Sequence, residues 1–258
     1  MNQKQVKEQI IFFPWTLWCM AWFLLVIFIF FPFLVLVVAI GNQKLIRLAH
    51  FVPHYLSIFL LKVWGVQLEI RGKEFIQSSK QLIYISNHRS YLDAFIASAS
   101  IPNYTKFLGK AEIKSWPVLG YLMEKFYVGV QRDDEKDRQR SMMLMSEKLK
   151  SGASFFICPE GTCNTTSSLL KHFHSGAFRL AIHHQLPIVP LTFVGSGELF
   201  PRHGLMLRPG KIVVVWHKEI STVNRTDADV NDLREQAIFQ IHKDLLLFYP
   251  DDRYEIVL

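Results

Sequence analysis

The chain is poor in the residues that mark several protein classes. Its 258 residues include only three cysteines, Cys19, Cys158 and Cys163, and their odd number and wide spacing exclude a disulfide framework. No Cys-x-x-Cys motif and no zinc-spaced group of Cys and His occurs. Only 13 glycines and 11 prolines are present, which excludes collagen-like and low-complexity chains. Because half of the residues are hydrophobic and 14% are aromatic, the composition also excludes a disordered chain.

Charge is absent from one long stretch near the N-terminus. No charged residue occurs between Ile10 and Ile40, whereas the remainder has the composition of an ordinary soluble protein. A straight helix of that length would reach roughly 46 Å, against a hydrocarbon core of about 30 Å. Pro14 and Pro32 each disfavour a helix interior at their positions. The stretch is too long for a signal peptide, and no small-residue cleavage pattern follows it.

Three membrane arrangements fit this stretch: one tilted span, a span with an interfacial turn, and a re-entrant pair of helices bent near a proline. Basic residues lie on both flanks, so the positive-inside rule gives no orientation for a single span and fits the re-entrant pair slightly better. A buried core helix is the remaining interpretation. Residues 43–64 follow with an amphipathic, basic pattern, typical either of helices lying on anionic headgroups or of a helix packed on the soluble core.

The chain carries an excess of positive charge. The formal net charge of +7 indicates a membrane surface or an anionic substrate as partner. A nucleic-acid partner is not expected, because the sequence has no basic stripe with interleaved aromatic residues and no recognised binding motif.

Beyond residue 65, short apolar runs alternate with helical patterns. This alternation predicts an α/β fold with a mixed, largely parallel sheet flanked by helices. The predicted strands are Val66–Ile70, Leu82–Ser86, Thr105–Leu108, Tyr127–Val130, Ser154–Cys158, Ile188–Val194 and Ile212–Trp216. The predicted helices are Tyr91–Ser100, Ser115–Lys125, Glu135–Lys150, Gly176–His184 and Thr226–Tyr249. We therefore predict a membrane-inserting and interfacial helical segment over 1–64 and one α/β domain over 65–258.

The first candidate site follows a predicted strand directly. His88 comes two residues after the strand Leu82–Ser86, where α/β sheets place their sites, and Asp93 follows five residues later. With His88 in the turn and Asp93 in the first helical turn, the carboxylate could fix the imidazole tautomer and leave the other nitrogen as a base. The second interpretation is structural, because Ser90 and Asp93 also have the spacing of a capping box.

The second candidate site is a turn after another predicted strand. Glu160, Gly161 and Thr162 follow Pro159, and such a turn can present backbone donors to an anion. Lys110 and Arg132 follow two further strands, so both are expected at the same sheet edge. Taken alone, the turn is more often structural, and the two cations are more often solvated surface charges.

Together these motifs resemble the lysophosphatidic acid acyltransferase family of membrane-bound glycerolipid acyltransferases. The resemblance covers residues 65 to about 220. Its blocks are His88–Asp93 with the HX4D pattern, 127–132 ending in Arg132, Pro159–Thr162, and 188–191 with a proline in an apolar strand. Lys110 matches a basic position between the first two blocks. The apolar N-terminal segment also suits this family, and the domain over 65–258 would then be an acyltransferase domain.

The resemblance implies an enzyme that moves a fatty acyl group to the free hydroxyl of a lysophospholipid. The implied product is phosphatidic acid, made from 1-acylglycerol-3-phosphate with acyl-CoA or acyl-carrier protein as co-substrate, without a cofactor or a metal. In that role His88 is the general base and Asp93 its orienting carboxylate. Lys110, Arg132 and the turn at 160–162 bind the acceptor's glycerol phosphate. The expected location is a membrane, with the active domain facing the cytoplasm, in the inner or plasma membrane of a bacterium.

The sequence departs from the family in its third block. The usual continuation supplies an arginine for phosphate, whereas Cys163 stands there in this chain. The acceptor could therefore be another lyso-lipid, including one that contains an amino acid. A thioesterase is a second hypothesis, which the absence of a G-x-S-x-G elbow disfavours for the serine class. A non-catalytic lipid-binding protein is a third. Cys163 as a nucleophile, and the histidines at 172, 174, 183 and 184 as metal ligands, are weaker hypotheses.

Overall fold

The computed structural model describes residues 3–110, 126–131, 134–201 and 206–250. By its internal contacts the chain divides into two compact units. The first unit contains residues 1–69, 89–102 and 193–214, and the second contains 70–88, 103–192 and 215–258. The chain therefore passes from one unit to the other five times. The boundary predicted between residues 64 and 65 stays a prediction.

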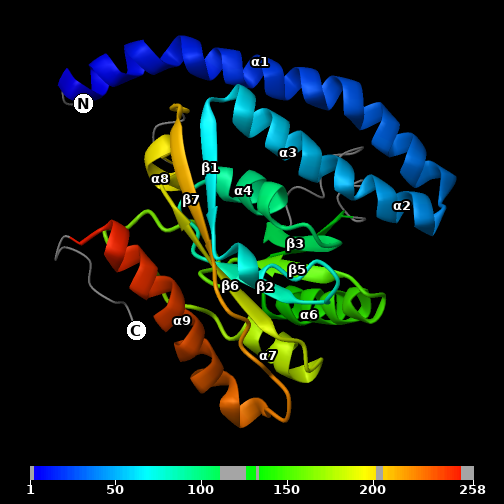
Figure 1. The fold of residues 1–258 in the computed structure, drawn as a ribbon. Coiled ribbons are helices and arrows are strands. Elements are labelled where there is room, and N and C mark those ends of the chain that lie inside the picture. Colours follow the sequence, from blue (N-terminus) through cyan, green and yellow to red (C-terminus); the bar gives the residue numbers. More distant parts are fainter. Residues whose placement is uncertain (1–2, 111–125, 132–133, 202–205, 251–258) are drawn as a thin grey trace. The chain divides into compact units, whose positions relative to one another are not determined.

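The first unit is built on one long apolar helix, α1 (Gln3–Ile40), which includes Pro14 and Pro32 in its interior (Figure 1). Its segment Ile11–Ile40 has a mean hydropathy of 3.3 and is long enough to cross a membrane. Because the helix continues through both prolines, the interpretation of two helices bent near a proline is wrong. Burial is one-sided: Cys19 and Val38 are buried, whereas Phe28 is 79% exposed.

Polar and aromatic contacts hold α1 within the first unit. The Trp64 Nε1–H donates to the carbonyl of Cys19 at 3.0 Å, and the Leu207 N–H donates to the Thr16 hydroxyl at 3.1 Å. The Phe23 ring stacks edge-on against Phe95 with 6.0 Å between the ring centroids. These contacts lie within the first three turns after Pro14 and favour the helix there over proline's local preference.

Two shorter helices follow α1. They are α2 (Gln43–Ala49), capped by the Asn42 side chain, and α3 (Phe51–Val63), which packs against α4 (Leu92–Ser100). Pro53 lies in the first turn of α3, where its missing N–H costs no helical hydrogen bond. The buried side of α3 includes Leu60 and Leu61, while Tyr55 is exposed. The amphipathic segment 43–64 thus forms the two helices α2 and α3, which have apolar side chains both on a packed side and on an exposed side.

The sheet has seven strands in the order β1-β7-β6-β2-β5-β3-β4, and it is mixed and largely parallel, as predicted (Figure 1). The neighbouring pairs β6–β2, β2–β5, β5–β3 and β3–β4 are all parallel. The strands are β1 (Val66–Arg71), β2 (Ile83–Ser86), β3 (Thr105–Lys110), β4 (Tyr127–Val130), β5 (Ser154–Ile157), β6 (Ile188–Val194) and β7 (Gly210–Trp216). Each predicted strand is present, with its ends within two residues of the prediction.

The helices of the second unit cover the strands of that unit. α6 (Glu135–Lys150) packs against β4 and β5, and α7 (Gly176–His183) packs against β2 and against α9 (Val230–Phe248). Short turns complete the described chain: η1 (Lys73–Phe75), α8 (Ser196–Leu199) in the first unit, and η3 (Asp227–Asp229). The predicted helix over 115–125 lies outside the described residues.

Candidate active site

The carboxyl ends of two adjacent strands bring the candidate residues together. β2 and β5 pair in parallel, with Ile85 opposite Ile157. His88 and Glu160 each lie three residues beyond these partners, so both leave the sheet at the same edge. This confirms the expectation that the segment after β2 and the turn after β5 meet.

The carboxylate of Glu160 fixes the backbone around His88. Glu160 is 2% exposed, and its Oε1 accepts the His88 N–H at 2.7 Å while its Oε2 accepts the Lys171 N–H at 3.0 Å. The carbonyl of His88 in turn accepts the Asn164 N–H at 2.6 Å. Hydrogen bonds to an ionised group contribute about 1.5–3 kcal/mol each, so Glu160 ties three chain segments together. We call this arrangement the Glu160 clasp.

The turn itself depends on Gly161. Its φ is +75°, a region that favours glycine, and its N–H donates to the Cys158 carbonyl at 3.1 Å. A Cβ at this position would lie 3.0 Å from the His174 ring. His174 is held there because its N–H donates to the Pro159 carbonyl at 2.9 Å. The glycine therefore permits both the turn and the close approach of the histidine.

Cys163 lies against the imidazole of His88. Its sulfur is 3.1 Å from Nε2 and 3.6 Å from Nδ1. A sulfur in line with one ring nitrogen would be much farther from the other, so these similar distances place it out of line with both. A nucleophile–base pair requires hydrogen-bond reach between the two groups. The reach is present here, but the alignment expected for proton transfer is not.

Asp93 belongs to the first unit, where its carboxylate binds the chain that follows His88. Its Oδ2 accepts the N–H of Arg89 at 2.8 Å and of Ser90 at 2.9 Å, and the side chain is 1% exposed. The Ser90 hydroxyl accepts the N–H of Leu92 at 3.1 Å. Half of the predicted capping box is thus present: Asp93 accepts the Ser90 N–H, whereas the Ser90 hydroxyl accepts from Leu92 and not from Asp93. The pairing of His88 with Asp93 stays a prediction, because the two residues belong to different units.

The two predicted cations lie at the limits of what the structure describes. The backbone of Lys110 pairs with Val130 at the ends of β3 and β4, but its side chain lies outside the described part. Arg132 lies outside the described residues altogether. Their roles stay predictions.

Lys171 is a site residue that the sequence analysis missed. Its Nζ donates to the Thr162 hydroxyl at 2.6 Å, so its ammonium lies at the turn. No sequence spacing indicated this contact, because residues 163–170 have no regular pattern that would predict a return to the turn. Within the described ranges, no group of three or more His, Cys, Asp or Glu side chains could hold a metal.

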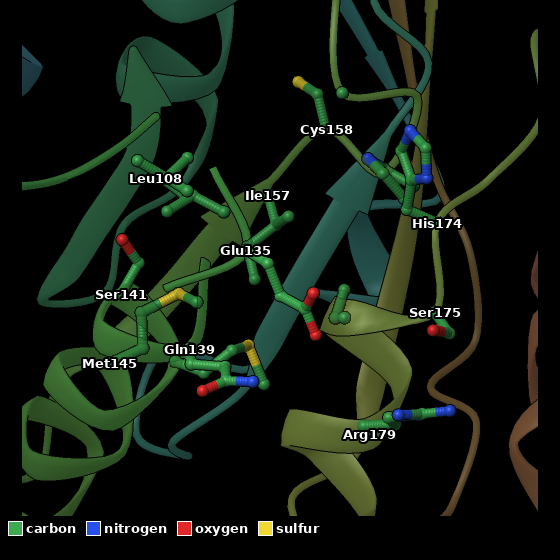
Figure 2. A pocket seen from close by; sticks show the side chains of 16 residues that line it. Leu108, Glu135, Gln139, Ser141, Met145, Ile157, Cys158, His174, Ser175 and Arg179 are labelled. Atoms are coloured by element: carbon green, nitrogen blue, oxygen red, sulfur yellow. The ribbon is translucent and has the colours of Figure 1, made fainter. Parts of the chain in front are cut away.

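A cavity of about 710 Å³ opens beside the turn. It is lined by the ends of β3, β4 and β5 and by α6 and α7, with Cys158 and His174 at one end (Figure 2). Leu108, Met145 and Ile157 contribute an apolar lining. The volume falls within the range of about 300–1,000 Å³ that small-molecule sites occupy.

A second His/Asp group in this unit is structural in its geometry. His217 Nε2 lies 2.8 Å from the Thr192 hydroxyl and 3.4 Å from an Asp244 carboxylate oxygen. A catalytic triad uses the two ring nitrogens for the two partners, whereas here both contacts involve the same nitrogen. Burial lowers the pKa of His217, and nearby Asp244 raises it by a smaller amount.

Comparison with known proteins gives the family. A family model described as Acyltransferase matches residues 67–194. A 1-acyl-sn-glycerol-3-phosphate acyltransferase of Saccharomyces cerevisiae is 30% identical over 79% of this chain and 67% of its own length. A chloroplast 1-acyl-sn-glycerol-3-phosphate acyltransferase of Brassica napus is 33% identical over 63% of this chain, which spans only 49% of that relative.

A solved structure agrees with the fold. The 1-acyl-sn-glycerophosphate acyltransferase PlsC from Thermotoga maritima superposes with a TM-score of 0.78, covering 95% of this chain and 98% of that one at 19% identity. At this identity the solved structure shows the fold alone, whereas the sequence relatives and the family model also show the family. The chain therefore belongs to the lysophosphatidic acid acyltransferase (1-acyl-sn-glycerol-3-phosphate acyltransferase) family.

Proposed function

We propose that this protein is a membrane-associated acyltransferase that acylates the free hydroxyl of a lysophospholipid. The preferred acceptor is 1-acylglycerol-3-phosphate, and the product is phosphatidic acid. One observation carries the proposal: the Glu160 clasp holds His88 at the sheet edge, directly beside a turn that offers a cation and hydroxyl. The names of the sequence relatives, which are 1-acyl-sn-glycerol-3-phosphate acyltransferases, support the choice of acceptor.

The proposed chemistry is direct transfer with His88 as general base. The imidazole removes the proton of the acceptor hydroxyl, and the oxygen attacks the thioester carbonyl of the donor. The new C–O bond forms, the C–S bond breaks, and the departing thiolate takes the proton from the imidazolium. A positioned base of this kind contributes about 10²–10⁴-fold to the rate. Asp93 is proposed to orient the imidazole, and the reaction requires no cofactor or metal.

The remaining predicted residues are proposed to bind the acceptor's glycerol phosphate. Thr162 offers a hydroxyl at the surface of the turn, Lys110 is the last residue of β3, and Arg132 comes two residues after β4 in the sequence. Gly161 allows the backbone of the turn to come close to the ligand. Glu160 is proposed to act through the backbone it holds, since both of its oxygens accept N–H groups.

The acyl chains of the donor and of the acceptor are proposed to bind in different places. The apolar cavity between the sheet, α6 and α7 is proposed to receive the donor's acyl chain. The exposed apolar side of α1 supports membrane association, which keeps the acceptor's chain in the bilayer. A cytoplasmic orientation and a bacterial membrane stay predictions.

A substrate panel tests the proposed function. Purified full-length protein in detergent is given acyl-CoA or acyl-carrier protein together with several lyso-lipids, one of them containing an amino acid, and the products are identified by mass spectrometry. We expect phosphatidic acid from 1-acylglycerol-3-phosphate, and none from the His88→Ala variant. Release of free fatty acid alone would indicate a thioesterase. Lipid binding without turnover of any donor would indicate a non-catalytic protein.

A further inference from the structure

Lys171 is fixed at the turn by its backbone, not by its charge. Its N–H is held by the buried carboxylate of Glu160 at 3.0 Å, while its side chain reaches back so that Nζ lies 2.6 Å from the Thr162 hydroxyl. The main chain of Lys171 is therefore positioned by the same carboxylate that positions His88. Its ammonium comes to the turn as a consequence.

The charge of Lys171 is not neutralised within the described part of the chain. Two other described lysines are paired: Lys80 Nζ lies 3.2 Å from a carboxylate oxygen of Glu219, and Lys211 pairs with Glu69. Lys171 forms no ion pair with a described carboxylate, and the one at its turn, Glu160, contacts its N–H instead. An ammonium has three protons to donate. One is directed at Thr162, which leaves two for a ligand.

Thr162 completes a small group of donors. Its hydroxyl oxygen accepts from Lys171, so its own proton is available to a second acceptor. Among the described residues, its N–H donates to no protein acceptor, and the side chain is exposed. An ammonium, a hydroxyl and a backbone N–H at one turn are donors of the kind that bind phosphate groups.

This group of donors includes the residue before Cys163, and Cys163 contacts the ring of the proposed base. The residue after Thr162 is Cys163, whose sulfur is 3.1 Å from His88 Nε2. An acceptor with its reacting hydroxyl at His88 and its anionic group on the adjacent carbon needs cationic and hydroxyl donors on this side of the base. Glycerol phosphate acylated at one end has this arrangement, since its free hydroxyl and its phosphate are on neighbouring carbons.

We infer that Lys171, with Thr162, binds the phosphomonoester of the acceptor and selects acceptors that carry this group; the inference rests on the proposed function. Cys163 occupies the position where a family arginine would bring a charge, and Lys171 supplies that charge from eight residues further along the chain. The donor also offers phosphates, in coenzyme A or in the phosphopantetheine arm of acyl-carrier protein. The experiment therefore measures the two substrates separately.

Steady-state kinetics of full-length protein in detergent test the inference. Lys171→Met is compared with Lys171→Arg and with Lys218→Met, a matched control because Lys218 is exposed and forms no described contact. We expect Lys171→Met to raise KM for 1-acylglycerol-3-phosphate by about tenfold or more, with little change in kcat or in KM for the donor. Lys171→Arg should restore most of the affinity, and Lys218→Met should match wild type. The uncharged acceptor 1-acylglycerol should be used equally by wild type and Lys171→Met.

Each other outcome overturns the inference in a distinct way. A rise in KM for the donor alone would assign the cation to the donor's phosphates. Unchanged constants in Lys171→Met would show that the ammonium binds no substrate phosphate. Binding of 1-acylglycerol-3-phosphate is also measured by intrinsic fluorescence in a His88→Ala background, with and without Lys171→Met. If binding there is equally tight, the inference fails, even if wild type transfers no acyl group and the proposed function fails as well.

Discussion

Two histidines of the second unit lie near the same kinds of polar group, but the carboxylate contacts the backbone of one and the ring of the other. His88 follows β2 and His217 follows β7, and each lies close to a carboxylate and a side chain with a hydroxyl or thiol. At His88 the carboxylate of Glu160 holds the backbone. At His217 the hydroxyl of Thr192 and the carboxylate of Asp244 lie near the ring itself, at one nitrogen.

This difference helps to distinguish a structural histidine from a candidate catalytic one. A ring whose nitrogen is held by a buried hydroxyl is fixed in place, and burial then lowers its pKa. At His88 the carboxylate instead holds the backbone N–H, and the ring contacts the sulfur of Cys163. The chain after β7 also runs antiparallel to the start of β6, through the bridge between Ile188 and Ile220, away from the parallel strands' carboxyl ends. Residue types alone would not separate these two sites.

The same substitution, made separately at each histidine, should give the largest difference in activity between the two sites. We expect His88→Gln to lower kcat for acyl transfer by about 10²-fold or more with an unchanged unfolding midpoint. His217→Gln should leave kcat close to wild type but lower stability by about 1 kcal/mol, since it disturbs a partly buried hydrogen bond. Kinetics and denaturant unfolding of both variants decide the matter. Equal losses of activity would place His217 in the mechanism.

Removing the Glu160 clasp should cost both stability and activity. Glu160→Ala leaves the partly buried N–H groups of His88 and Lys171 without their acceptor, and we expect about 2–3 kcal/mol of lost stability together with weak transfer. Denaturant unfolding and kinetics measure the two effects. Glu147→Ala, an exposed position on α6, is the control and should stay within about 0.5 kcal/mol of wild type. Unchanged stability in Glu160→Ala would mean that the clasp does not hold the fold.

The protonation of His217 should make stability depend on pH. Its pKa in the folded protein lies below the ordinary value of 6.5, chiefly because burial disfavours the charged ring. The folded state therefore binds fewer protons than the unfolded state, so this contribution is complete above the unfolded pKa and is lost as pH falls through the folded one. Unfolding curves between pH 8 and pH 5 should show falling stability. The fall should be smaller in His217→Gln, and an identical fall would assign it to other groups.

The smallest expected effect belongs to Cys163. Because its sulfur is out of line with both nitrogens of His88, Cys163→Ser should change kcat by less than about tenfold. Incubation with acyl donor and no acceptor, followed by intact-protein mass spectrometry, should detect no acylated enzyme. A loss as large as that of His88→Gln, together with an acyl adduct on the wild type, would instead show a covalent intermediate.

Local patterns in the sequence predicted the sheet and the meeting of His88 with the turn at Glu160 at one of its edges. The apolar runs that became β2 and β5 ended at His88 and at the turn before Glu160, and parallel pairing then required both to lie at one edge. The contacts of Cys163 and Lys171 could not be predicted in this way. They depend on how the irregular stretch after Thr162 folds back, which is decided by hydrogen bonds between distant residues such as Asn164 and His88.

At the N-terminal helix, a local pattern in the sequence gave a wrong prediction. Pro14 and Pro32 suggested breaks, because proline removes a hydrogen bond and crowds the preceding turn. The tertiary contacts of Trp64 and Leu207 with α1 were invisible to a local pattern, and they favour a continuous helix. Composition predicted the apolar character of the segment correctly, whereas its continuity depended on partners far along the chain.

The Glu160 clasp determines which substitutions near the turn the protein can accept. The carboxylate grips main-chain N–H groups, which every residue except proline possesses, so the side chains at 88 and 171 are not part of the grip. Position 171 can therefore be altered by evolution or by protein engineers without shifting the base. Under the proposal for Lys171, affinity for the acceptor can change while the backbone position of the base is kept.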